Sequence, residues 1–162
     1  MSRAENLILW TLGLTASALA PFFFPAVITQ LTFLWLMILF ALTWDIMGGQ
    51  MGYNSFGNIF FFGVGAYACA VIQRDSGLGW HLAFFIGMGA AALLSVVAAA
   101  VLGAGILGLR GQYFAIGSLG LGIAGGEVAA GWDYIGAGSG LSPPLYPGAL
   151  GNREFFFYFL FL

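Results

Sequence analysis

The sequence contains very few charged side chains and no lysine. Of its 162 residues only 6% are charged, and the four basic residues are all arginine, against six acidic ones. A soluble domain usually has about a quarter of its residues charged, whereas 61% of this chain is hydrophobic. The composition therefore excludes a soluble domain. The lack of a basic surface also excludes nucleic acid as a ligand.

Cysteine and histidine are almost absent, with one residue of each. These numbers exclude a disulfide framework, and they exclude a metal site that needs several such ligands from this chain. Cys69 lies between alanines, which indicates helix packing, and His81 beside Trp80 is typical of an anchor at the membrane interface. Because His81 has no serine or cysteine companion in its segment, a nucleophile and base pair is not expected. We expect no catalytic residue, no metal site, no cofactor and no enzymatic activity in this chain.

Long apolar runs predict an all-α, polytopic transmembrane helix bundle. At about 20 residues per crossing, the chain has room for about five spans and the start of a sixth. The third run is short for a full crossing and favours a broken or re-entrant element. Arg3 precedes the first run, and no arginine follows it closely, so the N-terminus is placed in the cytoplasm. We expect one transmembrane domain over residues 1–162, cut off at its C-terminal end, with its helices at residues 7–24, 27–47, 59–72, 81–109, 113–130 and 155–162.

Small residues recur along two of the expected spans. In lipid, helices associate through close backbone approach across small side chains. A stripe of small residues at every fourth position predicts a helix-packing seam formed by Gly87, Ala91, Ser95, Ala99 and Gly103. Gly122 and Gly126 predict a second, shorter seam.

One glycine pattern imitates a nucleotide site. Residues 120–125 match the Gly-x-Gly-x-x-Gly fingerprint of dinucleotide-binding folds. They lie inside an apolar span, without a βαβ pattern and without an acidic residue about 20 positions later, so we interpret them as helix-packing glycines. The chain also has no phosphate-binding loop with its lysine. Any ATP chemistry must therefore come from a partner.

A polar, glycine-rich stretch interrupts the apolar pattern at residues 48–58. An ionisable group inside a membrane is costly and usually lines a cavity. This draws attention to Asp45 just before the stretch and to Glu127 in the fifth expected span. Two interpretations stay open: a path for a polar solute, or an ordinary solvated loop with carboxylates near the headgroups. For the first, we expect the substrate pathway to include Asp45, Gln50, Asn54, Ser55, Asn58 and Glu127.

Two blocks of sequence carry a family resemblance. Residues 41–58 read Ala-Leu-Thr-Trp-Asp-Ile-Met-Gly-Gly-Gln-Met-Gly-Tyr-Asn-Ser-Phe-Gly-Asn, and residues 61–67 continue as Phe-Phe-Gly-Val-Gly-Ala-Tyr. Residues 108–122 contain Leu-Arg-Gly-Gln-Tyr-Phe-Ala-Ile-Gly-Ser-Leu. Together they resemble the N-terminal portion of LivM-type inner-membrane permeases of branched-chain amino acid ABC importers, over residues 31–147.

The resemblance implies a transport subunit in the bacterial inner membrane that works by alternating access. Its implied partners are a second related permease subunit, two ABC ATPase subunits that hydrolyse ATP, and a periplasmic substrate-binding protein. The family usually has Asn at the place of Asp45, His at that of Asn58 and Glu at that of Ile123. Because urea and short-amide permeases resemble the same family, these departures leave the substrate class open. The sequence is also compatible with a passive solute channel, with a membrane scaffold and, more remotely, with an intramembrane enzyme.

Overall fold

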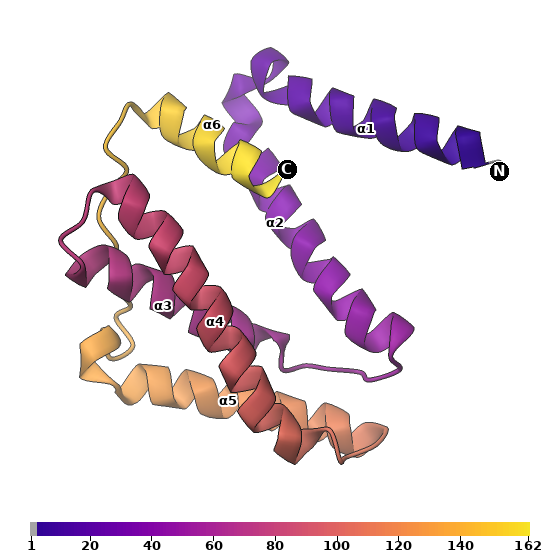
Figure 1. Ribbon diagram of the computed structural model, residues 1–162, viewed down its shortest axis with the longest axis vertical. Helices are drawn as coiled ribbons and strands as arrows, with labels where there is room; N and C mark the ends of the chain where they lie inside the picture. Colours follow the sequence, from indigo (N-terminus) through magenta and orange to yellow (C-terminus); the bar gives the residue numbers. More distant parts are fainter. Residues whose placement is uncertain (1–2) are drawn as a thin grey trace. The chain divides into compact units, whose positions relative to one another are not determined.

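The computed structural model describes residues 3–162, and within that range it is 79% helical and contains no strand. The apolar pattern therefore correctly predicted an all-helical protein. Figure 1 shows the helices in chain order. The long elements are α1 (Arg3–Phe23), α2 (Ile28–Asp45), α3 (Asn58–Asp75), α4 (Trp80–Ile106), α5 (Gln112–Gly131) and α6 (Leu150–Phe161), with the short turns η1 (Pro25–Val27), η2 (Ile46–Gln50) and η3 (Asp133–Ile135).

Four segments are long and apolar enough to cross a membrane: Glu5–Phe23, Pro25–Gln50, Trp80–Ile106 and Gln112–Gly131. α3, where the short third run favoured a broken or re-entrant element, is instead one continuous 18-residue helix. It is not among the four candidate spans, and its last turn contains Arg74 and Asp75. α6 begins at Leu150, five residues earlier than expected. Among the described residues, the helices thus support a membrane protein with four candidate spans, one fewer than expected.

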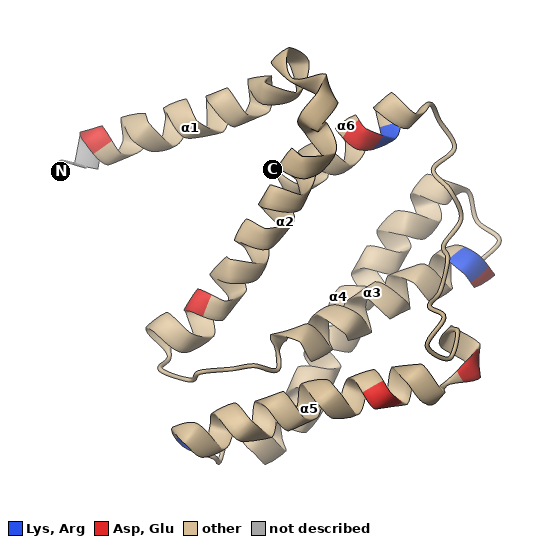
Figure 2. Ribbon diagram, turned by 180° about the vertical axis from the view of Figure 1, so that it is seen from behind, with Lys and Arg blue, Asp and Glu red and all other residues tan. Residues whose placement is uncertain are grey.

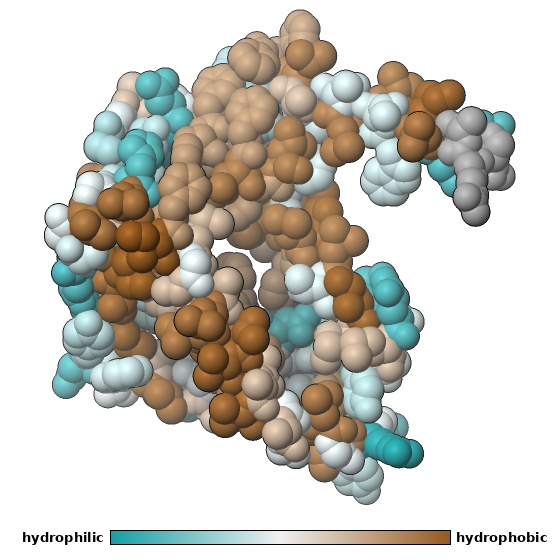
Figure 3. Space-filling model, viewed as in Figure 1, coloured by the Kyte–Doolittle hydropathy of each residue, from teal (hydrophilic) through white to brown (hydrophobic). Residues whose placement is uncertain are grey.

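Much of the helical surface is apolar and exposed. On α4, for example, Leu93, Val96 and Val101 are each 65–68% exposed. Figure 3 shows such apolar side chains over the visible face of the molecule. A soluble monomer rarely presents large contiguous apolar patches, whereas hydrocarbon solvates these side chains without cost. The exposed surface therefore indicates a helix assembly that lies in lipid.

The chain divides into two compact units. The first, here called the terminal unit, consists of the described part of residues 1–42 together with residues 148–162, and contains α1, η1, most of α2 and α6. The second, the central unit, consists of residues 43–147 and contains α3, α4 and α5.

In the central unit, α3 packs against both α4 and α5, and most closely against α4. A methyl group in place of the Gly87 hydrogen would lie 2.9 Å from the Sγ atom of Cys69 on α3. One face of α4 is therefore in direct backbone contact with α3. Ser95 on the same face donates a hydrogen bond of 3.3 Å to the carbonyl oxygen of Phe61.

The remaining members of the expected α4 stripe do not all face α3. Ala91 lies close to Gly65 of α3, whose added methyl group would be 3.7 Å from the Ala91 Cβ atom. Gly103 instead faces Leu107, the residue directly after α4, and Ala99 is exposed. Contact with α3 thus involves the N-terminal part of the stripe.

The glycines of α5 contact the start of α3. A methyl group added at Gly122 would lie 3.1 Å from Ile59, and one at Gly125 would overlap the ring of Phe60. By contrast, Gly126, which the sequence paired with Gly122, has nothing within 4 Å of such a group. The tight approach between α3 and α5 therefore uses Gly122 and Gly125.

Candidate functional site

The polar stretch begins where α2 loosens into a wider turn. After Asp45, the five residues of η2 form a π-helical turn, closed by a hydrogen bond of 3.2 Å from the Met51 N–H to the Ile46 carbonyl. Two adjacent glycines within this turn favour the departure from α-helix, because glycine is a poor helix former. Gly52 then adopts a left-handed conformation with φ of 73°, which a glycine allows without strain. Residues 51–57 follow as a non-helical segment, here called the polar break.

Ser118 of α5 binds the end of the polar break. The backbone N–H of Phe56 donates a hydrogen bond of 3.0 Å to the Oγ atom of Ser118, whose own hydroxyl donates to the carbonyl of Ala115 at 3.0 Å. The backbone of Gly57 also approaches α5 closely, since a methyl group there would lie 3.2 Å from the carbonyl oxygen of Ser118. Ser118 and Gly57 are both buried. The Ser118 hydroxyl oxygen thus accepts a hydrogen bond from a backbone N–H that lies in a non-helical segment.

The polar break meets α5 well inside that helix. Ser118 lies six positions after the first residue of α5, Gln112, which corresponds to about 9 Å along the axis at 1.5 Å per residue. Next to it, the ring of Phe114 contacts the ring of Tyr53 edge-on, with centroids 4.9 Å apart. If α5 spans a bilayer, non-helical backbone therefore lies below the membrane surface. Such backbone is tolerated at depth only where protein covers it or where it lines a water-filled cavity.

The polar side chains expected in the pathway take different positions. Gln50 and Asn54 are exposed. Ser55, in contrast, is only 4% exposed, and its Oγ atom accepts a hydrogen bond of 3.3 Å from the N–H of Gly57. Asn58 begins α3 and is half-buried, and its buried Nδ2 atom has no hydrogen-bond partner. Gln50 and Asn54 thus face the surroundings, while Ser55 bonds to the backbone of the polar break.

The two carboxylates lie apart from each other. Asp45 is exposed, and its carboxylate folds over Gly49, where an added methyl group would overlap it. Glu127 is also exposed, nine residues after Ser118 on α5. Nine residues correspond to about two and a half turns, so Glu127 lies on the face of α5 opposite Ser118. Figure 2 shows these acidic positions near the end of α2 and in α5. Of the two, Asp45 adjoins the polar break and Glu127 faces away from it.

A second polar cluster, which the sequence did not reveal, lies at the other end of α3. Arg74 forms an ion pair with its neighbour Asp75, with 2.6 Å between Nε and Oδ1, and donates to the carbonyl of Tyr134 at 2.9 Å. The hydroxyl of Tyr134 donates to Asp75 at 2.6 Å. Nearby, the indole of Trp80 donates to the carbonyl of Pro144 at 3.0 Å. These bonds fasten the long segment after α5 to the turn between α3 and α4.

The cluster has a defined protonation state. Hydrogen bonds from Arg74, and secondly from Tyr134, lower the pKa of Asp75 from 3.8 to about 2. The same contact with Asp75 raises the pKa of Tyr134 and that of Arg74 above their ordinary values. The carboxylate is therefore charged and the phenol neutral at physiological pH. Tyr134 is distant in sequence from the pair that it binds, so no local pattern could have indicated the contact.

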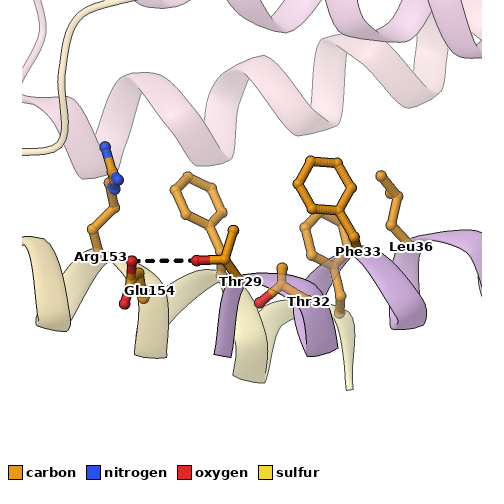
Figure 4. Close-up of a pocket in the computed structure, with 8 residues that line it drawn as sticks. Thr29, Thr32, Phe33, Leu36, Arg153 and Glu154 are labelled. Carbon is orange, nitrogen blue, oxygen red and sulfur yellow. Dashed lines mark hydrogen bonds between the residues drawn. The ribbon is translucent and has the colours of Figure 1, made fainter. Parts of the chain in front are cut away.

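The terminal unit contains a separate groove of about 330 Å³ between α2 and α6. Figure 4 shows its lining and the hydrogen bond of 3.3 Å from Thr29 to Glu154. Its apolar part is formed by Phe33, Leu36, Phe157 and Phe161, and its polar part by these two residues with Thr32 and Arg153. Within residues 3–162, no group of three or more histidine, cysteine or acidic side chains is arranged to hold a metal ion.

Comparisons with protein-family models, with curated proteins and with solved structures found no match to this chain.

Proposed function

We propose that this chain is a membrane-spanning permease subunit in which the polar break lines the path of a polar solute. The observation that carries the proposal is the position of the Phe56 N–H, which Ser118 binds about two turns inside α5. A cytosolic loop would have no need of a partner at that depth, because water would satisfy its backbone.

The chemistry of the break suits a solute with hydrogen-bonding groups. Its Asn54 amide is exposed, and so are the Gln50 amide at the end of η2 and the Asp45 carboxylate at the start of that turn. Amides both donate and accept hydrogen bonds, and interrupted helices in transporters commonly provide solute sites near the membrane midplane. A solute with an amino or amide group would find partners of both kinds here.

The finer assignment follows from the sequence resemblance. We propose an ABC importer subunit for branched-chain amino acids in the bacterial inner membrane, and, as the alternative cargo, urea or a short amide. Because the chain has no lysine and no phosphate-binding loop, ATP hydrolysis is assigned to two partner ATPase subunits. A second related permease subunit and a periplasmic substrate-binding protein complete the proposed assembly. Alternating access would then expose the break to each side in turn.

Solute uptake by cells tests the proposal. Asn54→Ala removes an exposed amide at the break, and Asn152→Ala removes one from the exposed start of α6 as a matched control. With the partner subunits present, we expect Asn54→Ala to reduce uptake of labelled leucine or urea about tenfold or more, and Asn152→Ala to leave it unchanged. Equal uptake by both variants would overturn the placement of the path. Uptake that persists after ATP depletion would instead identify a passive channel.

A further inference from the structure

The last turn of α1 contains a proline that leaves one carbonyl without its helical partner. Pro21 lies inside α1 and is almost fully buried. Proline has no N–H, so the carbonyl four residues earlier loses the hydrogen bond that an α-helix would supply. That carbonyl belongs to Ser17. In hydrocarbon no water can replace the missing donor, and an unsatisfied backbone group costs several kcal/mol there.

A tyrosine from α6 provides the replacement donor. The hydroxyl of Tyr158 donates a short hydrogen bond to the carbonyl oxygen of Ser17, 141 residues away in the sequence. Tyr158 is only 1% exposed. The indole N–H of Trp35 on α2 in turn donates to the Tyr158 oxygen at 3.4 Å. The three helices of the terminal unit are therefore joined by a relay from indole to phenol to carbonyl.

Nonpolar contacts between α1 and α6 surround this relay. The ring of Phe22 lies 5.5 Å from that of Phe155 and 6.4 Å from that of Phe159. Ring contacts of this kind occur over centroid distances of about 4.5–7 Å and in both offset-stacked and edge-to-face arrangements, so they allow α6 several positions. The hydroxyl, in contrast, must meet one lone pair of one carbonyl. The hydrogen bond of Tyr158 therefore restricts the position of α6 more narrowly than the ring contacts do.

We propose that Tyr158 is a latch: its hydroxyl takes the place of the absent Pro21 N–H and couples the docking of α6 to the proline turn of α1. If α6 moves away, the carbonyl of Ser17 loses its donor in an environment without water. If α1 changes its conformation at Pro21, Tyr158 loses its acceptor. The inference concerns the terminal unit alone and does not depend on the proposed transport function.

A double-mutant cycle tests the coupling. Tyr158→Phe removes only the hydroxyl, and Pro21→Ala restores the backbone donor to Ser17. In the background that keeps Pro21, with the protein purified in detergent, we expect Tyr158→Phe to lower the Tm by roughly 2–6 °C. In the Pro21→Ala background the same change should lower it by less than half as much, because the carbonyl then has a helical partner. Equal losses in both backgrounds would overturn the proposal.

A direct measurement on the carbonyl keeps the test independent of stability. Ser17 and Ala18 form the one Ser-Ala pair in the sequence, so combining ¹³C-carbonyl serine with ¹⁵N-alanine isolates the Ser17 carbonyl in a solid-state NMR spectrum of the protein in lipid bilayers. Tyr158→Phe should move this signal upfield, as expected when a hydrogen bond is lost. Tyr113→Phe, at a tyrosine that is 75% exposed, should leave it in place. An unmoved signal in Tyr158→Phe would refute the latch.

Discussion

The central and terminal units each contain backbone that has lost its helical hydrogen bond, and each uses a hydroxyl from a neighbouring helix to satisfy it. In the central unit, Ser118 accepts from the Phe56 N–H. In the terminal unit, Tyr158 donates to the Ser17 carbonyl. The central defect extends over residues 51–57, whereas the terminal defect is a single carbonyl.

The two defects differ in how many polar groups they leave to be paired. One proline in a helix needs one donor, and once the carbonyl is paired the site is complete. A non-helical segment of seven residues exposes more polar groups than one serine can satisfy. Its Asn54 amide is exposed, as is the amide of Gln50 at the end of η2 just before it. Under the two proposals above, the terminal defect serves helix docking and the central one serves solute passage.

The largest expected effect comes from forcing the polar break away from α5. Gly57→Val places methyl groups against the carbonyl of Ser118, which a Cβ atom alone would approach to 3.2 Å. Overpacking and loss of the neighbouring hydrogen bond should together reduce stability by about 3 kcal/mol, measured by unfolding in detergent, and should abolish uptake.

The matched control is Gly63→Val on α3, where an added methyl group meets nothing within 4 Å. We expect a change below about 1 kcal/mol there. If Gly57→Val lowers the stability no more than this control does, the polar break does not approach α5 as closely as described.

A smaller effect is expected from removing the hydroxyl of Ser118. Ser118→Ala leaves the Phe56 N–H without an acceptor and should cost about 1–2 kcal/mol, within the range measured for membrane helices and buried donors. Ser95→Ala removes a hydroxyl that only donates to the Phe61 carbonyl. Both variants lose some stability, but we expect reduced solute uptake per folded molecule only in Ser118→Ala. If both variants reduce uptake equally, Ser118 contributes to helix packing in the same way as Ser95 and has no separate role beside the path.

The outer bond of the terminal relay should matter less. Trp35→Phe removes the longer hydrogen bond, at 3.4 Å, and leaves Tyr158 bonded to Ser17. Its effect on stability should be about 0.5 kcal/mol, with the NMR signal of the Ser17 carbonyl almost unmoved. Trp10→Phe, at an indole that is 73% exposed, controls for the change of ring. If Trp35→Phe lowers the stability more than Tyr158→Phe does, the bond from Trp35 is the more important of the two, which contradicts the proposed latch.

The smallest effect on stability is expected at the cluster of Arg74, Asp75 and Tyr134 at the end of α3. This cluster is not part of either backbone defect. Because the folded-state pKa of Asp75 is lowered from 3.8 to about 2, its contribution to stability is present above pH 4 and is lost as the pH falls toward 2. The raised pKa of Tyr134 keeps its hydroxyl a donor through pH 9. The Tm difference between wild type and Asp75→Asn should therefore be small and constant from about pH 5 to 9 and shrink below pH 4.

Ser139→Ala, in the segment that the cluster fastens, is the control for this profile. Because it removes no titratable group, its Tm difference from wild type should show no such narrowing in acid. A Tm difference for Asp75→Asn that grows as the pH falls would contradict the assigned sign.

Hydropathy predicted the helices well, because lipid imposes long apolar runs on any span. It placed α4 and α5 within a few residues and located the interruption after α2. The positions of single partners could not be predicted in this way. Ser118 is one serine in an apolar helix, and nothing in its neighbourhood indicates that it binds Phe56. The same holds for Tyr158, whose partner lies at the other end of the chain.

Register explains why the second glycine seam was assigned in part to the wrong residue. Gly125 and Gly126 are adjacent, and a spacing of four favoured Gly126, whereas the packed face of α5 continues from Gly122 to Gly125. Spacings of three and four both keep residues on one face of a helix. The choice between them depends on the position of the partner helix, here through Phe60 of α3.

The most direct test of the central claim is the reactivity of a thiol placed at position 54. In a Cys69→Ala background the chain has no other cysteine, so Asn54→Cys can be followed with a charged, membrane-impermeant thiol reagent. A solute path along the polar break predicts that the reagent reacts with this cysteine in the assembled transporter and that saturating solute slows the reaction several-fold. A reaction that is equally fast with and without solute, over all candidate amino acids and amides, would contradict a solute path along the polar break.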